Sequence, residues 1–234
     1  VKSLGVTRLQ LVLGGSMGGM QALEWSVAQG DMVERAAVLA APGRIRAHAV
    51  AFNEVQRYAI QSDSKWNNGN YTPDDGPVNG LATARMLGMI TYQSEESMER
   101  KFGSRRIKGK TAFGKRDWPK IRQYLQYQGE KLVKRFDANS YLCLLRALDL
   151  FDLSRDGRGY LSALSQIRAS VLVIGISSDI LYPPHQQREL VSDLAAAGVR
   201  AQYCEIRSSL GHDAFLLEFD QLGPAIRSCL LRTR

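Results

Sequence analysis

A serine flanked by glycines joins an apolar segment to a helical one near the start of this chain. The apolar residues 9–13 run into Gly14-Gly15-Ser16-Met17-Gly18-Gly19, and helical spacing begins at once. A strand, a tight turn and a helix in this order form a nucleophile elbow, in which the serine holds a strained backbone and presents its hydroxyl. The pattern is short, and a structural Gly/Ser turn explains it equally well. The rest of the sequence has to decide between the two.

The neighbours of Ser16 have expected roles in such a turn. Gly14 and Gly18 are expected to remove clashes between side chains and the backbone of the turn. The following helix would direct its first N–H groups at the space above the hydroxyl, where an oxyanion develops during acyl transfer. The N–H of Met17 is therefore the expected first donor of an oxyanion hole.

The two ends of the chain read as strands alternating with helices. Apolar runs predict strands at residues 9–13, 35–41, 170–176 and 201–206, and helical spacing predicts helices at residues 18–29, 184–197 and 214–231. This alternation favours a mostly parallel sheet with right-handed crossovers, the α/β class.

The middle of the chain is helical instead. Helices are predicted at residues 47–60, 80–92, 118–136 and 140–150, with a turn-rich loop at residues 67–79. A helical block between two α/β sections is typical of an inserted lid. The predicted organisation is a first core part at residues 1–43, a lid at residues 44–155 and a second core part at residues 156–234.

Two further residues complete a candidate triad with Ser16. Asp179 follows the predicted strand that ends at Ile176, and His212 follows the strand that ends near Ile206. Catalytic residues of parallel sheets lie at the carboxyl ends of strands, and the order Ser, Asp, His is that of α/β-hydrolases. His212 would accept the proton of Ser16, and Asp179 would orient the imidazole.

Each member of this set has an ordinary alternative. Asp179 is a possible turn or cap residue before two prolines, and His212 a possible loop histidine. The competing bases are His48, in the predicted lid, and His185, which opens the helix after Asp179. Neither follows the last strand. The triad indicates acyl transfer but does not say whether water, an amine or an alcohol takes the acyl group.

The charge and the cysteine content limit the remaining classes of function. The chain of 234 residues carries a formal net charge of +8, and its basic residues concentrate between Lys101 and Lys120. A solvated loop is the first interpretation of this stretch. A surface for an anionic cosubstrate such as a nucleotide-bearing thioester is another, and a nucleic-acid arm lacks a recognition motif. Three scattered cysteines predict neither a disulfide framework nor a metal site, and they favour a reducing compartment.

The sequence also bears on location. No apolar run approaches the roughly 20 residues of a membrane span. The first residues hold no start methionine and no signal-peptide core. We therefore expect a cytoplasmic protein, or a fragment of one, without a membrane partner.

Several long strings resemble the homoserine O-acetyltransferase family, in which an α/β-hydrolase domain carries a helical lid. The likeness covers essentially the whole chain. It is carried by residues 14–25 (GGSMGGMQALEW), 52–57 (FNEVQR), 80–92 (GLATARMLGMITY), 127–131 (YQGEK), 135–142 (RFDANSYL) and 211–215 (GHDAF).

The resemblance implies ping-pong chemistry in methionine biosynthesis. Ser16 would take an acetyl group from acetyl-CoA, a cosubstrate rather than a bound cofactor, and pass it to the hydroxyl of L-homoserine. Arg85 would hold the homoserine carboxylate, Tyr92 would support the site, and Asp213 would bind the α-amino group. Arg85 and Tyr92 are seven residues apart on a predicted helix and so share a face. Without the resemblance, a solvated helix charge and a helix N-cap explain Arg85 and Asp213 as well.

The resemblance also leaves alternatives open. Within the family the donor could be succinyl-CoA, and the acceptor serine or deacetylcephalosporin C. An esterase would use the same triad with water, and a non-enzymatic binding protein would not use it at all. The family further suggests a homodimer built through the lid.

The chain departs from the family at its start. Members have a long section before the elbow that supplies the first strands and the second oxyanion-hole N–H, whereas only fifteen residues precede Ser16 here. We expect an α/β-hydrolase fold that lacks its N-terminal strands and a partner segment or subunit that supplies them. Alone, the chain is expected to be poorly active.

Overall fold

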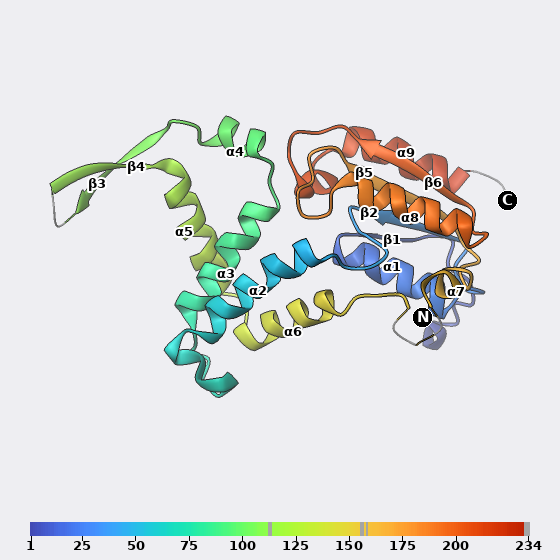
Figure 1. The fold of residues 1–234 in the computed structure, drawn as a ribbon, viewed down its shortest axis with the longest axis horizontal. Coiled ribbons are helices and arrows are strands. Elements are labelled where there is room, and N and C mark those ends of the chain that lie inside the picture. The colour runs from blue at the N-terminus through green and yellow to red at the C-terminus, as the bar shows by residue number, and fades with distance from the viewer. Residues whose placement is uncertain (112–113, 155–156, 158, 232–234) are drawn as a thin grey trace. The chain divides into compact units, whose positions relative to one another are not determined.

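The chain divides into two compact units (Figure 1). The computed structural model describes residues 1–111, 114–154, 157 and 159–231. Unit 1 comprises Val1–Ile45 and Leu150–Arg234, and unit 2 comprises Arg46–Asp149. The sequence placed the inserted block at residues 44–155.

Unit 1 contains a four-stranded parallel sheet in the order β1-β2-β5-β6. Its strands are β1 (Val12–Gly15), β2 (Arg35–Leu39), β5 (Ser170–Ile176) and β6 (Ala201–Ile206). The last two have the predicted bounds. Strand β1 begins later than predicted because Leu9 forms only an isolated bridge with Val33. Strands β2 and β5 pair directly, with Leu39 opposite Ile174, although all of unit 2 lies between them in the sequence.

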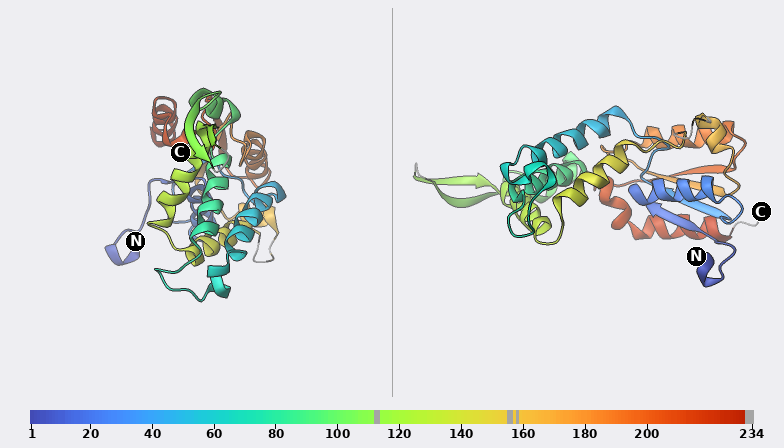
Figure 2. Two further views of the ribbon diagram at one scale, coloured as in Figure 1. Left: turned by 90° about the vertical axis from the view of Figure 1, so that its left-hand side faces the viewer. Right: turned by 90° about the horizontal axis from the view of Figure 1, so that it is seen from below.

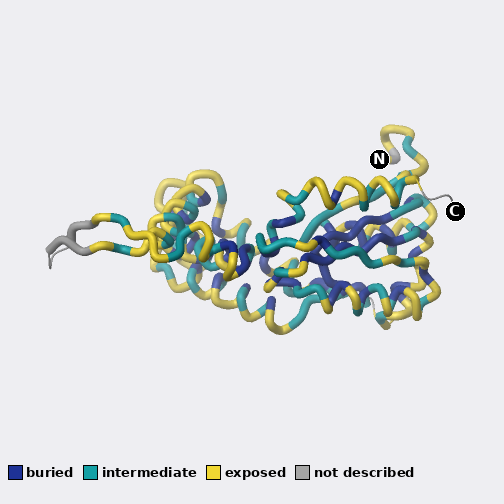
Figure 3. The backbone as a smooth tube through the Cα atoms, turned by 90° about the horizontal axis from the view of Figure 1, so that it is seen from above, coloured by how far each residue is buried: buried dark blue, intermediate teal, exposed yellow. Residues whose placement is uncertain are grey.

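Helices cover both faces of this sheet. Helices α1 (Met17–Ala28) and α8 (Pro184–Ala196) contact β1 and β2, and β5 and β6, respectively. Helix α9 (Phe219–Leu231) contacts β2 and β6, and its Leu222 packs with one set of alternate strand residues in the core. The intervening residues of β2 and β5 are buried too, so these two central strands lie in the buried middle layer in Figures 2 and 3. The buried residues of β2 and β5 include Ala36, Ala37, Val38, Leu39, Val171, Leu172, Val173 and Ile174.

Three short helices complete the described part of unit 1. They are η1 (Lys2–Leu4), α7 (Tyr160–Leu164) and η3 (His212–Leu216). The sequence predicted one closing helix over residues 214–231, and this is wrong, because η3 and α9 are separate. The N–H of Glu218 donates to the Ala214 carbonyl at 2.8 Å, while the Glu218 carboxylate accepts from Ser208 at 2.6 Å. These bonds fix the chain at the break.

Unit 2 is mainly helical. It contains α2 (Ala47–Gln61), η2 (Ser64–Gly69), α3 (Val78–Thr91), α4 (Glu95–Lys101), α5 (Lys120–Val133) and α6 (Ala138–Asp149). Helix α3 contacts both α2 and α5. A Cβ at Gly80 would lie 2.5 Å from the Ala59 carbonyl oxygen, and a Cβ at Gly129 would lie 2.9 Å from that of Ala82. Glycine at these two positions therefore allows the three helices to approach closely.

The basic stretch of unit 2 is a correction to the sequence analysis. A solvated loop was expected between Lys101 and Lys120, but strands β3 (Arg106–Thr111) and β4 (Gly114–Pro119) form an antiparallel hairpin. Ile107 pairs with Trp118 across the strands, and the guanidinium of Arg122 lies 4.1 Å from the centre of the Trp118 ring. Cross-strand pairing of this kind stabilises a hairpin even where charged residues hide the strand pattern.

Candidate active site

Ser16 lies at a sharp turn between β1 and α1. Its backbone has φ 56° and ψ −123°, a conformation that non-glycine residues rarely adopt. Its N–H donates to the Leu39 carbonyl of β2 at 2.8 Å, and its own carbonyl accepts from the N–H groups of Gly19 and Met20. Both strands and the helix therefore hold the strained residue in place, as a nucleophile elbow requires.

The glycines around Ser16 do not all have the expected role. A Cβ at Gly14 would lie 2.1 Å from the Gly18 carbonyl oxygen, so glycine is required there. A Cβ at Gly18 would meet nothing within 4 Å, which corrects the expectation that its side chain would clash. Gly18 contributes its backbone, and the close approach of that backbone forbids a side chain at Gly14. A Cβ at Gly19 would lie 2.8 Å from that of Ala41.

The start of α1 presents backbone donors beside the serine. Met17 is the first residue of α1, so its N–H has no acceptor within the helix. The N–H groups two and three residues further on are already bonded to the Ser16 carbonyl. The Met17 N–H is therefore a backbone donor next to Ser16, and its role in an oxyanion hole stays a prediction.

Asp179 and His212 form a buried hydrogen-bonded pair. The Asp179 Oδ2 lies 2.7 Å from the His212 Nδ1, and the two residues are 4% and 2% exposed. The other oxygen, Oδ1, accepts from the N–H groups of Leu181 at 2.8 Å and Tyr182 at 2.9 Å. These bonds fix the carboxylate, so that it can hold one imidazole tautomer with Nδ1–H toward Asp179.

The two loops that carry this pair are tied together. The Gly211 N–H donates to the Ser178 hydroxyl at 2.9 Å, and Ser177 and Ser208 exchange hydrogen bonds at 3.0 Å. Gly211 has φ 82°, a backbone conformation that favours glycine, immediately before the histidine. The position of His212 is thus set by its loop as well as by Asp179.

An aromatic side chain joins the histidine to the elbow. The Phe215 ring lies 5.6 Å from the His212 ring, measured between centroids, and edge-on to it. The same ring occupies the space beside Gly15, where an added Cβ would lie 2.4 Å from it. The imidazole and the residue preceding Ser16 therefore contact one side chain. Tyr182 packs against the imidazole as well, with ring centroids 5.4 Å apart.

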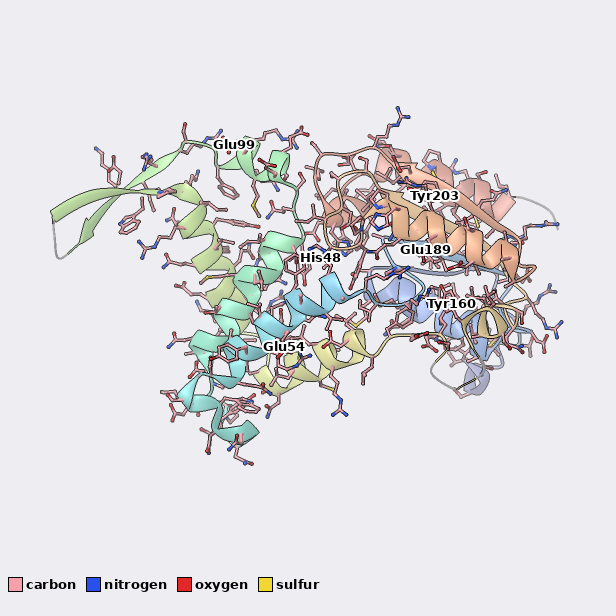
Figure 4. All side chains as sticks on the ribbon, in the orientation of Figure 1. His48, Glu54, Glu99, Tyr160, Glu189 and Tyr203 are labelled. Atoms are coloured by element: carbon pink, nitrogen blue, oxygen red, sulfur yellow. The ribbon has the colours of Figure 1, made fainter. Side chains whose placement is uncertain are left out.

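The other two histidines have a different character. His48, which is labelled in Figure 4, lies on α2 in unit 2. His48 and His185, on α8, are exposed, whereas His212 is buried. The His48 ring packs at a tilt against the Phe52 ring, with centroids 4.7 Å apart. Burial and a carboxylate partner single out His212 as the candidate base.

The residues that the resemblance assigned to the acceptor lie in both units. Asp213 is in unit 1, half-buried in the first turn of η3 beside His212. Arg85 and Tyr92 are in unit 2, where the guanidinium lies 5.7 Å from the centre of the Tyr92 ring. They share a face of α3, as predicted, although Tyr92 is the residue that ends the helix. Among the residues that the structure describes, no carboxylate forms an ion pair with the half-buried Arg85.

Sequence reasoning missed the supporting residues Phe215, Tyr182 and Gly15. The sequence carried one usable signal for them. Two glycines precede Ser16, whereas the elbow pattern requires only one. The ring that fills the space beside Gly15 comes from a segment about two hundred residues away in the chain. A single sequence does not reveal such a pairing.

The family that matches residues 1–219 is described as alpha/beta hydrolase fold. The chain belongs to the α/β-hydrolase fold family. The resemblance found in the sequence is confirmed by a curated homoserine O-acetyltransferase from Carboxydothermus hydrogenoformans, which is 46% identical over 98% of this chain. The α/β-hydrolase chain spans 61% of that relative's length.

Two solved structures resemble this α/β-hydrolase closely. Homoserine O-acetyltransferase from Bacillus anthracis matches with a TM-score of 0.89 and 25% identity, over 99% of this chain and 62% of the other. Esterase E22 matches with a TM-score of 0.87 and 28% identity, over 98% of this chain and 63% of the other. The same fold therefore occurs in a protein named as a transferase and in one named as an esterase.

The described residues hold no group of three or more His, Cys, Asp or Glu side chains that could bind a metal ion. None of the helices in that part of the chain has the length and apolar character needed to cross a membrane.

Proposed function

We propose that the protein containing this chain transfers an acetyl group from acetyl-CoA to the hydroxyl of L-homoserine. The observation that carries the proposal is the buried Asp179–His212 pair in the same unit as the strained Ser16. The name of the 46% identical relative supports homoserine as the acceptor. The product, an O-acetyl amino acid, would enter methionine biosynthesis.

The first half-reaction forms an acetyl-enzyme. The Ser16 Oγ attacks the thioester carbonyl while His212 accepts its proton at Nε2. The Met17 N–H stabilises the oxyanion, and Asp179 stabilises the imidazolium. The carbon–sulfur bond then breaks, the CoA sulfur takes the proton from His212, and acetyl-Ser16 remains.

The second half-reaction passes the acetyl group to the acceptor. His212 takes the proton of the homoserine hydroxyl, whose oxygen attacks the acetyl carbonyl, and returns it to the Ser16 oxygen as O-acetylhomoserine leaves. Arg85 would bind the carboxylate through its guanidinium fork, with Tyr92 as its support, and Asp213 would bind the ammonium. The absence of an ion-pair partner for Arg85 among the described residues supports this role.

The reaction would also need groups that this chain does not provide. An oxyanion hole of this type takes a second N–H from a loop before the elbow. Because the chain spans 61% of its relative's length, we propose that a further segment or subunit provides this donor. A homodimer built through the helices of unit 2 is part of the same proposal. Acetyl-CoA acts as a cosubstrate, and no metal or bound cofactor takes part.

Esterase activity is the second candidate, favoured by the likeness to esterase E22 at a TM-score of 0.87. Transferase and esterase activity are distinguished by measuring the rate of CoA release from acetyl-CoA with and without L-homoserine. A transferase predicts that homoserine accelerates CoA release and that O-acetylhomoserine forms in equal amount. Equal rates with acetate as the product would support the esterase instead. Succinyl-CoA as donor, and serine or deacetylcephalosporin C as acceptor, are tested in the same assay.

A further inference from the structure

Unit 2 contains a buried polar network that the proposed function does not use. Asn53 and Gln56, on α2, are 6% and 4% exposed. The Asn53 amide donates to Asp149 Oδ1 on α6 at 2.7 Å, and Asp149 Oδ2 pairs with Arg57. The Tyr141 hydroxyl on α6 donates to Gln56 Oε1 at 2.5 Å. Burying polar groups is costly unless they are bonded to one another, and these groups are.

The network reaches Tyr92 through a glycine. A Cβ at Gly88, on α3, would lie 3.4 Å from the Tyr92 hydroxyl and 3.5 Å from Gln56 Oε1. The phenol end of Tyr92 and the amide of Gln56 therefore both lie over the bare backbone of Gly88. The Arg85 guanidinium lies 5.7 Å from the centre of the Tyr92 ring, so Gly88 links the hydrogen-bonded pair of Tyr141 and Gln56 to the pair of Tyr92 and Arg85.

The electrostatics are consistent with this proximity. Burial raises the pKa of Tyr141 well above its ordinary value, the nearby Tyr92 raises it further, and Arg85 opposes both effects. Tyr141 is therefore a neutral hydrogen-bond donor at physiological pH. Its hydroxyl lies close enough to Tyr92 and Arg85 to sense the charge of each.

Tyr71, also in unit 2, forms hydrogen bonds of a different kind from those of Tyr141. Tyr71 donates to Asp137 at 2.5 Å and accepts from the Asn139 N–H at 2.9 Å, which ties η2 to the start of α6. Asp137 and Asn139 are exposed. These bonds hold a loop in place and contact neither Arg85 nor Tyr92.

We propose that Gln56 and Tyr141 are positioning residues for the acceptor, which hold Tyr92 and through it the Arg85 guanidinium in place to bind the acceptor carboxylate. This inference rests on the proposed function. It assigns a role to two residues within the strings 52–57 and 135–142, for which the reaction itself has no use. Neither residue has a role in the proposed acetylation of Ser16, so the first half-reaction should be independent of both.

The experiment measures the two half-reactions separately in the complete protein, including the segment that its relatives carry beyond this chain. In ping-pong kinetics, kcat/KM for acetyl-CoA reports acetylation alone and kcat/KM for homoserine reports deacetylation alone. Tyr141→Phe is expected to lower kcat/KM for homoserine by about 3- to 10-fold, the value of one buried hydrogen bond. The value for acetyl-CoA should stay within about twofold of wild type. Tyr71→Phe, which also removes one bonded hydroxyl from unit 2, should change neither.

Two further measurements separate positioning from a structural role. With 3-amino-1-propanol, the acceptor that lacks the carboxylate of homoserine, Tyr141→Phe should match wild type. In an Arg85→Ala background, Tyr141→Phe should have no added effect on homoserine. Gln56→Met keeps the volume of the side chain but loses the amide, and it should lower kcat/KM for homoserine as Tyr141→Phe does. It replaces Tyr141→Phe in the experiment if that variant does not fold.

The outcomes distinguish the two proposals. A wild-type protein whose CoA release does not respond to homoserine overturns the proposed function, and this inference with it. A wild type that responds, with a Tyr141→Phe variant that keeps its kcat/KM for homoserine or loses both half-reactions equally, overturns only the inference. Additive losses in the Arg85→Ala background also overturn it.

Discussion

Two glycines of the elbow, Gly14 and Gly18, should have opposite effects on the stability of the fold when each is replaced by alanine. Gly14→Ala would place a methyl group 2.1 Å from the Gly18 carbonyl oxygen and 2.2 Å from its carbon. Both atoms are backbone, so the turn has to open by about 1 Å, and overpacking of this kind costs about 1–3 kcal/mol. Gly18→Ala meets open space within a helix, where alanine is favoured over glycine by about 0.5–1 kcal/mol.

Thermal unfolding of the two variants measures this difference without any need for activity. For a chain of this length, 1 kcal/mol corresponds to about 2–4 °C in Tm. Gly14→Ala should lower Tm by about 2–12 °C, and Gly18→Ala should raise it by about 1–4 °C. Since a displacement of about 1 Å at a reacting group can cost 100-fold in rate, only Gly14→Ala should also impair acetylation of Ser16. If Gly18→Ala lowers Tm as much as Gly14→Ala, the described geometry of the elbow is wrong.

The other predictions concern the base and the lid. Asp179→Asn keeps the size of the side chain but loses control of the imidazole tautomer, and kcat should fall by about 10⁴-fold with an unchanged circular dichroism spectrum, whereas a loss below tenfold would remove Asp179 from the triad. Asp137→Ala removes the N-cap of α6, whose Ser140 N–H donates to Asp137 at 2.6 Å, and should lower Tm by about 2–4 °C at neutral pH. Burial raises the pKa of Asp137, but hydrogen bonds from Tyr71 and Ser140 outweigh burial and leave it below its ordinary value. The Tm difference between wild type and Asp137→Ala should therefore be complete above about pH 4 and should shrink as the pH falls through the lowered pKa; a difference that grows in acid would contradict this account.

The central strands of unit 1, β2 and β5, were largely predictable because nearly all of their residues are buried. Strand β5 is an unbroken apolar run, and its predicted bounds match the structure. Strand β6 also matches. The end of β2 was placed two residues too late because Ala40, although buried and apolar, has φ 46° and leaves the strand conformation. Hydrophobicity predicts burial, but it does not predict where the backbone turns.

Unit 2 was less predictable because its details depend on capping and pairing. Helix α4 was missed, although Ser94 caps it and two acidic residues follow, a pattern that indicates a helix start. The β3–β4 hairpin was missed because its strands are too charged to show a buried face. The approach of Gln56, on α2, to Gly88 and Tyr92 of α3 depends on how the two helices pack, which no local pattern encodes.

The order and types of the candidate catalytic residues were predictable from the sequence, but the side chains that pack around them were not. Asp179 and His212 each follow a strand, and the structure joins them at 2.7 Å. The Phe215 ring that contacts both the imidazole and the elbow became visible only with tertiary structure. Side-chain chemistry can be inferred locally, whereas the packing that positions it cannot.

The most direct test of the account is intact-protein and peptide mass spectrometry after brief exposure of the complete protein to acetyl-CoA. Ser16 is expected to carry one acetyl group, which L-homoserine removes as O-acetylhomoserine. Ser16→Ala should show no gain in mass, and succinyl-CoA serves as the alternative donor. A protein that converts homoserine without any acyl group on Ser16, or an adduct on another residue that survives in Ser16→Ala, would contradict the central claim.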